Sequence, residues 1–300
     1  MLRGAYADNS NRVYTAAHNA YRQFACTVSN VNGTVGDLDD VSLFIAYLSY
    51  QMFSPNTIIT YTSAICQELK QRNGLDLGGH FLVKRLLKCV KKDRSCDLRL
   101  PISMGLLHKL NLATVHVCTS CYEATLFACI FNLAFHGLFR ISELVATRQS
   151  SPSILLYSHI SIIENNVATL NVKVVKSKTD QFSRSCNVVL HKQPDEHARI
   201  CPIVSVTRYM SLRPATFATF FVHADGRVVT SSQCNHVLQL CLKYLNINDS
   251  ARYSSHSFRI GGCTHLSKRG VSEEALKMAG RWRSDAYKKY IRQTTIIPLT

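Results

Sequence analysis

Acidic residues are scarce in this sequence. It contains 19 aspartate and glutamate residues against 35 lysine and arginine residues, which gives a formal net charge of +16 at pH 7. A basic excess of this size favours a polyanionic partner, and nucleic acid is the usual one. The hydrophobic content of 46% excludes a disordered chain, and 300 residues are enough for two domains that each bury a core.

The sequence also lacks a long apolar run. The most apolar stretch, residues 124–139, contains Asn132 and His136, and a membrane span needs about 20 apolar residues. The N-terminal residues are polar and predict no signal peptide, and no basic amphipathic helix with an aromatic face predicts membrane binding. We therefore expect a protein that is not secreted and has no membrane partner. Its 12 cysteines would be reduced thiols, in the nucleus of a eukaryote or otherwise in the cytoplasm.

A second cysteine pair for a structural metal site is missing. Cys118 and Cys121 form the only C-x-x-C pair, whereas a structural zinc site needs four ligands at suitable spacing. There is also no internal repeat. The sequence therefore predicts no metal and no cofactor, with thiols scattered through the core.

Hydrophobic periodicity predicts a mainly α-helical chain with a small β-sheet or hairpin. The expected domains are a helical one over 1–98 and an α+β one over 99–300. Period-two alternation predicts strands over 167–175 and 186–190, with a hairpin between them. Helical spacing predicts the other elements, over 41–53, 58–72, 80–92, 103–112, 124–139, 203–212, 231–245, 257–268 and 273–278.

The expected helix over 80–92 combines an apolar face with a face of five cations. Such a face is usually solvated, but here no acid interrupts it, so contact with nucleic-acid phosphates is about equally favoured. The cations are Lys84, Arg85, Lys88, Lys91 and Lys92.

Arg140 follows the most apolar stretch of the chain, and Glu143 comes three residues later. At that spacing both side chains can lie on one helical face. A salt bridge that only orients a helix end is one interpretation. The other keeps the bridge and directs the planar guanidinium at a phosphate.

His256 and Arg259 are one helical turn apart, and Gly261-Gly262 follows them. The glycines would let another backbone approach closely. A histidine in such a place is usually a satisfied core or cap group. In a basic protein it can instead move a proton near neutral pH, while the arginine holds phosphate oxygens.

Four further residues carry chemistry only in combination. Lys178 lies on the expected hairpin, with Lys176 nearby. The plainer interpretation of Lys178 is an exposed lysine in a turn, and the functional interpretation is a general acid. Trp282 is the only tryptophan, and it either packs in the core or donates its indole N–H to a phosphate. Tyr287 and Tyr290 are both candidates for a nucleophile that neighbouring cations would support.

Taken in order, Arg140, Lys178, His256, Arg259, Trp282 and Tyr290 resemble the signature of the tyrosine recombinases, the integrase and Cre-like family. The phrases SKTDQF, HSFRIGG and GRW…YIR are most similar to recombinases of eukaryotic mobile elements, the Crypton and DIRS-like groups. The segment SPNTIITYTSAI is similar to the family's core-binding domain. The resemblance covers most of residues 15–295.

The resemblance implies a two-domain C-shaped clamp on double-stranded DNA and self-association into a tetrameric synapse. Tyr290 would attack the scissile phosphate and form a 3′-phosphotyrosine. Arg140, His256, Arg259 and Trp282 would hold the phosphate, Glu143 would support Arg140, and Lys178 would protonate the leaving 5′ oxygen. Neither ATP nor a metal is implied. The interval from Trp282 to Tyr290 is one residue shorter than expected, so Tyr287 remains an alternative nucleophile.

Two other functions remain open on the sequence. One is a catalytically silent DNA-binding protein derived from a mobile element, which the basic charge supports equally well. The other is a type IB topoisomerase, which would use the same chemistry without a partner duplex.

Overall fold

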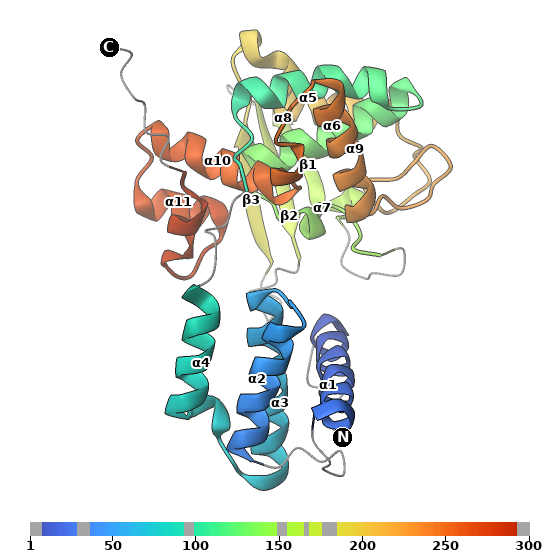
Figure 1. Cartoon of the computed structure of the whole chain (residues 1–300). Helices are drawn as coiled ribbons and strands as arrows, with labels where there is room; N and C mark the ends of the chain where they lie inside the picture. Colours follow the sequence, from blue (N-terminus) through green and yellow to red (C-terminus); the bar gives the residue numbers. More distant parts are fainter. Residues whose placement is uncertain are drawn as a thin grey trace. The chain divides into compact units, whose positions relative to one another are not determined.

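The computed structural model describes residues 8–28, 37–92, 99–148, 155–164, 168–175 and 185–292. The chain divides into two compact units, residues 1–97 and 98–300 (Figure 1). Each unit has a hydrophobic core of its own.

The smaller unit consists of helices packed around an aromatic core. Ser54 caps α3 by accepting a hydrogen bond from the Thr57 N–H at 3.2 Å. Gly74 closes α3 with a φ of +70°, a left-handed conformation that favours glycine. Phe24 and Phe44 meet in the core with ring centroids 5.5 Å apart. The elements are α1 (Asp8–Val28), α2 (Leu38–Tyr50), α3 (Pro55–Asn73), η1 (Leu77–Gly79) and α4 (Phe81–Lys92).

The larger unit combines helices with a three-stranded antiparallel sheet in the order β1-β2-β3 (Figure 1). The helices are α5 (Met104–Val117), α6 (Cys121–His136), α7 (Ile141–Leu144), α8 (Pro202–Leu212), α9 (Ser231–Tyr244), α10 (His256–Lys268) and α11 (Glu273–Gly280). The strands are β1 (Ile160–Glu164), β2 (Ala168–Val174) and β3 (Cys186–His191), and the short 3₁₀ turns are η2 (Tyr157–His159), η3 (Asp195–Ile200), η4 (Ser250–Arg252) and η5 (Asp285–Tyr290).

The prediction of a mainly helical chain with a small sheet is confirmed, and two details of it were wrong. The β2–β3 pair was expected, and the structure places Val172 opposite Val188. Strand β1, which pairs with the other edge of β2, was not expected. The apolar helix was expected to reach residue 139, whereas α6 ends at His136. The chain turns there because Leu138 takes a φ of +47°.

Helix α6 forms the centre of the larger unit, and ten of its residues are buried. The polar side chain of Asn132 is fully buried, and hydrogen bonds to its amide group offset the cost of burial. The Asn132 side-chain amide donates to Ser205 Oγ at 2.6 Å, and its carbonyl oxygen accepts from the side-chain amide of Asn111 at 2.7 Å. The network joins α6 to α5 and α8, so the central helix is fixed from two sides.

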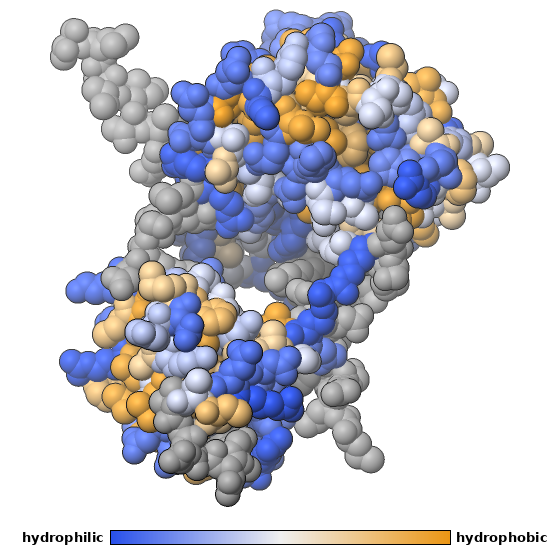
Figure 2. Space-filling model, turned by 45° about the vertical axis from the view of Figure 1, so that its right-hand side comes forward, coloured by the Kyte–Doolittle hydropathy of each residue, from blue (hydrophilic) through white to orange (hydrophobic). Residues whose placement is uncertain are grey.

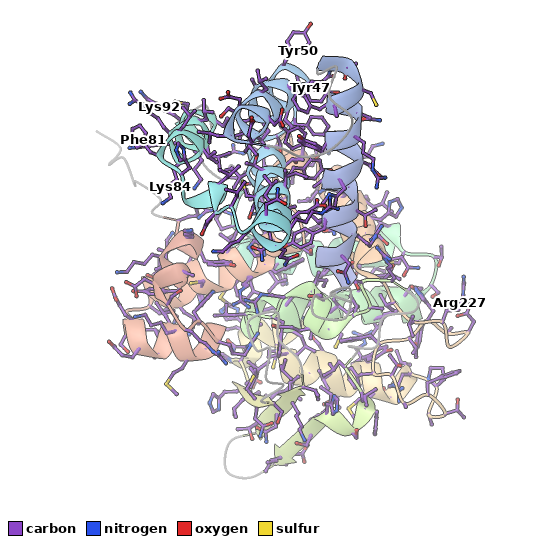
Figure 3. The ribbon with its side chains drawn as sticks, turned by 90° about the horizontal axis from the view of Figure 1, so that it is seen from below. Tyr47, Tyr50, Phe81, Lys84, Lys92 and Arg227 are labelled. Carbon is purple, nitrogen blue, oxygen red and sulfur yellow. The ribbon has the colours of Figure 1, made fainter. Side chains whose placement is uncertain are left out.

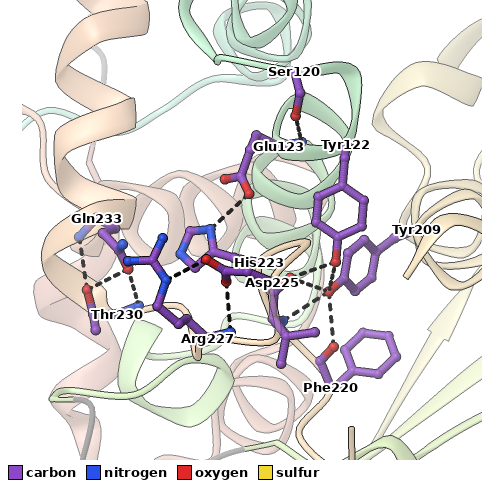
Figure 4. Close-up of polar contacts among 11 residues, drawn as sticks. Ser120, Tyr122, Glu123, Tyr209, Phe220, His223, Asp225, Arg227, Thr230 and Gln233 are labelled. Atoms are coloured by element: carbon purple, nitrogen blue, oxygen red, sulfur yellow. Dashed lines mark hydrogen bonds and ion pairs between the residues drawn. The ribbon is translucent and has the colours of Figure 1, made fainter. Parts of the chain in front are cut away.

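Polar contacts also fix the turn between Val222 and Val228 against the start of α6 (Figure 4). The Tyr122 hydroxyl donates to the Val222 carbonyl at 2.7 Å, and Glu123 contacts Nδ1 of His223 at 2.8 Å. This turn leads into Thr230, the N-cap of α9.

Hydrophobic and hydrophilic side chains both reach the surface of the larger unit (Figure 2). Among the residues that the structure describes, no helix is both long and apolar enough to cross a membrane.

Candidate active site

The N-terminal half of α10 is held tightly against the core of the larger unit. The Ile102 N–H donates to the Ser257 carbonyl at 3.1 Å. A Cβ on Gly261 would lie 1.9 Å from the Ile102 carbonyl oxygen, and one on Gly262 would lie 2.2 Å from the Phe135 carbonyl oxygen. The prediction that the two glycines allow a close backbone approach is confirmed. This packing fixes the side chains that α10 presents.

Arg259 is completely buried. Its guanidinium donates to the carbonyl of Leu138 and, at 2.5 Å, to the carbonyl of Gly280. Its Nε–H has no hydrogen-bond partner within the described residues. Because a buried donor without a partner is costly, this group is suited to a ligand that accepts a hydrogen bond.

Two more arginines share the carboxylate of Glu143, whose side chain is only 2% exposed. Arg140 binds one carboxylate oxygen at 3.0 Å, and Arg281 binds the other at 2.8 Å. The expected Arg140–Glu143 ion pair is therefore present. Its geometry differs from the expectation, because Arg140 precedes α7 as an extended N-cap and does not lie on a helical face. Its backbone N–H also donates to Glu143 at 3.0 Å.

The carbonyl oxygen of Leu138 joins the arginines, because it accepts hydrogen bonds from both Arg259 and Arg281. Leu138 and Arg281 are also two of the non-glycine residues with a left-handed backbone, with φ values of +47° and +57°. Such conformations cost about 1–3 kcal/mol each and persist where the surroundings enforce them. Here they direct a carbonyl and a side chain toward the same cluster.

The cluster has an excess of positive charge, since it holds three guanidiniums and one carboxylate, that of Glu143. Burial, and then the charges of Arg140 and Arg281, lower the pKa of Arg259 to about 10, while Glu143 and Tyr290 oppose this shift. At this pKa Arg259 stays charged near pH 7. A bound anion such as a phosphodiester would relieve the mutual repulsion of the guanidiniums.

Trp282 lies beside Arg259, with the guanidinium carbon 4.5 Å from its ring centroid. The indole also lies directly against Gly280, where a Cβ would approach a ring carbon to 1.8 Å. Its N–H is shielded from solvent and has no hydrogen-bond partner within the described residues. The side chain packs in a small apolar cluster, as one of the two interpretations expected, and donation of its N–H to a phosphate stays a prediction.

Tyr290, at the end of η5, contacts three predicted site residues. Its ring centroid lies 5.0 Å from that of His256, 5.0 Å from that of Trp282 and 5.4 Å from the guanidinium carbon of Arg259. The Thr264 hydroxyl donates to its backbone carbonyl at 3.1 Å, which ties η5 to α10. Its side chain is partly exposed, so a substrate can reach it.

Tyr287 has a different environment, and only 1% of it is exposed. It packs against Trp282 in the apolar cluster, with ring centroids 6.3 Å apart. Burial, followed by the nearby carboxylate of Glu273, raises its pKa. Both effects disfavour the phenolate that would attack phosphorus.

The remaining predicted site residues are basic residues outside the cluster around Tyr290. Lys176 and Lys178 lie outside the described residues. The five cations of α4 are exposed, and within the described residues none of them forms an ion pair. Phe81 and Lys84 lie near the start of this helix and Lys92 at its end (Figure 3).

Arg281 is the residue that the sequence analysis missed. It lies inside the phrase GRW, between Gly280 and Trp282, but an arginine next to an aromatic residue has no spacing that signals a buried ion pair. Its partner Glu143 is 138 residues away along the chain, so only the fold reveals the contact.

No protein-family model matches the sequence, and no curated protein matches it. Several solved structures do. A lambda integrase dimer bound to a COC′ core site gives a TM-score of 0.68 at 11% identity, over 98% of this chain and 92% of that one. XerH recombinase in its post-cleavage complex with palindromic difH gives a TM-score of 0.64 at 12% identity, and the match covers 95% of this chain and 76% of that one. The Tn1549 transposon integrase with transposon right-end DNA gives a TM-score of 0.62 at 14% identity, and the match covers 98% of this chain and 92% of that one.

The chain has the tyrosine recombinase fold. At identities this low the similarity establishes the fold and not the reaction, so the function of this chain depends on its own side chains. The tyrosine recombinase fold brings Arg140, Glu143, His256, Arg259, Trp282 and Tyr290 into one region of the larger unit.

Proposed function

We propose that the protein is a site-specific DNA recombinase or integrase that breaks and rejoins strands through Tyr290. The observation that carries the proposal is the position of the Tyr290 ring, which contacts His256, Trp282 and Arg259. His256 and Arg259 lie on α10, Trp282 follows α11 and Tyr290 ends η5. Together they provide a nucleophile, a proton-transfer group and phosphate donors. The three solved structures compared above carry DNA.

In the proposed reaction, the Tyr290 oxygen attacks the scissile phosphorus as its proton leaves toward His256. The new O–P bond replaces the bond from phosphorus to the 5′ oxygen of the leaving strand, and Lys178 protonates that oxygen. Arg140, Arg259 and the indole N–H of Trp282 stabilise the charge on the phosphate oxygens. A 5′ hydroxyl from a partner strand then reverses the step, so the bond energy is retained without ATP or a metal.

The cations of α4 suit a supporting role in DNA binding. They are exposed and carry no ion pairs within the described residues, so they are available for phosphates at no cost in broken salt bridges. We assign Lys84, Arg85, Lys88, Lys91 and Lys92 to this contact, and Lys176 to the contact near the leaving strand. The two units would close on duplex DNA as a clamp, and four copies would join two duplexes.

The biological role that we propose is integration or excision of a mobile element, which in a eukaryotic host would take place in the nucleus. The similarity to a transposon integrase supports this assignment at the level of the fold.

The test uses a nicked duplex, so that cleavage releases a short strand and traps the covalent product. Pooled terminal sequences of the parent element serve as substrate, and a denaturing gel detects the adduct. We expect an adduct with the wild type and with Tyr287→Phe, and none with Tyr290→Phe. An adduct with Tyr290→Phe but not with Tyr287→Phe would show that the nucleophile is assigned wrongly.

The same assay separates the two alternatives. DNA binding without any adduct would favour the catalytically silent binding protein. Relaxation of a supercoiled plasmid without recombinant products would favour a type IB topoisomerase.

A further inference from the structure

A surface groove on the larger unit lies away from the candidate active site. Its volume is about 370 Å³, and α5, α6, α8 and the end of η3 line it. Its apolar lining includes Val115, Ala124, Ala128 and Val204. Ala124 and Ala128 belong to the first half of α6, whereas Arg140 and Glu143 of the candidate active site follow the other end of that helix. The groove is therefore not part of the proposed catalytic machinery.

Two arginines, Arg199 and Arg208, line the groove, and no aspartate or glutamate does. Within the described residues, neither guanidinium forms an ion pair or a hydrogen bond. An apolar floor with unpaired guanidiniums suits an occupant that presents apolar side chains next to carboxylates. A DNA backbone would provide the negative charge but not the apolar surface.

Helix α2 of the smaller unit has that complementary surface. Leu43 is 50% exposed and Tyr50 is 84% exposed, and the exposed Ala46 lies between them. These three residues are spaced as i, i+3 and i+7, so they form one stripe along the helix. Tyr50 projects outward from the end of the helix (Figure 3).

The start of α2 is acidic, and the helix contains no lysine or arginine. Asp39 lies in its first turn and makes no ion pair within the described residues. In a chain with a net charge of +16, an acidic, apolar helix face is unusual. It repels DNA phosphates and matches a basic, apolar groove.

We propose that α2 of one copy docks in the groove of a second copy. Leu43 and Tyr50 contact the apolar lining there, and Asp39 faces Arg199 and Arg208. Since two different surfaces meet, the contact is heterologous, and it builds rings or chains instead of a closed two-fold dimer. The inference specifies a surface for the self-association in the proposed function, but its tests contain no DNA, so either proposal can fail alone.

The contact is small, because α2 has 13 residues and a helix of that length extends about 20 Å. One helix face buries less than the roughly 1,000 Å² expected of a stable interface. The association is therefore weak in free solution and stronger between copies that share one DNA molecule. Sedimentation velocity over the full soluble concentration range is the suitable measurement.

The decisive experiment mixes two complementary variants. One carries Ala128→Glu and Arg208→Glu and has lost the groove; the other carries Leu43→Ser and Tyr50→Ser and has lost the helix stripe. Each alone should sediment as a monomer at every concentration. Their mixture should form a one-to-one dimer that grows no further, because each pair retains one intact contact. The wild type should grow beyond a dimer or close into a ring.

A charge swap provides the second measurement. Asp39→Arg and Arg208→Glu should each abolish the association, and both together in one chain should restore it. Val189→Ser is the matched control, because Val189 is 51% exposed on β3, and it should change nothing. A wild type that stays monomeric at every concentration overturns the proposal. Association that persists in the groove variants also overturns the proposal. The groove would then bind a small anion or another protein.

Discussion

Replacing Glu143 with glutamine should destabilise the larger unit specifically. The carboxylate binds both Arg140 and Arg281, at 3.0 Å and 2.8 Å, and its side chain is 2% exposed. Removing one partner of a buried ion pair costs about 3–5 kcal/mol. Glutamine keeps one acceptor oxygen, so we expect the lower end, about 3 kcal/mol. For a unit of this size that corresponds to a fall in Tm of about 6–12 °C.

The assay is urea unfolding followed by tryptophan fluorescence. Trp282 is the only tryptophan in the chain and lies in the larger unit, so the signal reports that unit alone. The midpoint should fall without a change in slope. Sulfate should recover more stability in Glu143→Gln than in the wild type, because an anion can replace the negative charge that the substitution removes from beside the arginines.

Glu164→Gln is the control, since Glu164 is an exposed carboxylate at the end of β1 and its loss should have little effect. A midpoint for Glu143→Gln that matches this control would refute the argument. It would mean that the three guanidiniums are solvated well enough to tolerate one another without the carboxylate.

Three further outcomes follow from the structure. Gly261→Ala should cost about 3 kcal/mol or more in the same urea assay, because its Cβ would lie 1.9 Å from the Ile102 carbonyl oxygen and overpacking of a core is destabilising. Burial lowers the pKa of His136 from 6.5 to about 4. As the pH falls below 6.5, His136 therefore becomes protonated in the unfolded chain but stays neutral in the folded one. The free energy of unfolding, which is at its full value above pH 6.5, should decline by about 1–2 kcal/mol between pH 7 and 5. Lys84→Ala combined with Lys88→Ala should reduce the slope of log binding constant against log salt by about 2 in a DNA-binding titration.

Each of these outcomes has a matched control. Gly105→Ala adds a Cβ in open space within α5 and should be nearly neutral. In His136→Gln the decline in stability between pH 7 and 5 should be smaller than in the wild type, and an unchanged decline would assign it to other groups. Lys70→Ala removes a lysine already paired with Asp76 at 2.6 Å and should leave the salt slope unchanged. A slope that is also unchanged in the α4 variant would mean that this helix does not contact DNA.

Much of the fold could be predicted from the sequence because the signals are local. Each signal is formed by residues close together in the sequence. Examples are the Ser54 cap, the closing Gly74 and the apolar spacing of α3, α6 and α9. Strand β1 was missed for the same reason. It is short, and its burial pattern is irregular, so its assignment depends on pairing with β2.

The candidate site shows where local signals end. The sequence by itself determined which chemical groups the chain carries and their order, because residue types and short spacings such as His256 to Arg259 are properties of one segment. Only the tertiary structure decided how they meet. It placed Arg281 on Glu143 from 138 residues away, and it buried Tyr287 while leaving Tyr290 partly exposed against His256. The physical reason is that burial and charge pairing depend on what packs against a side chain, and those neighbours come from distant parts of the chain.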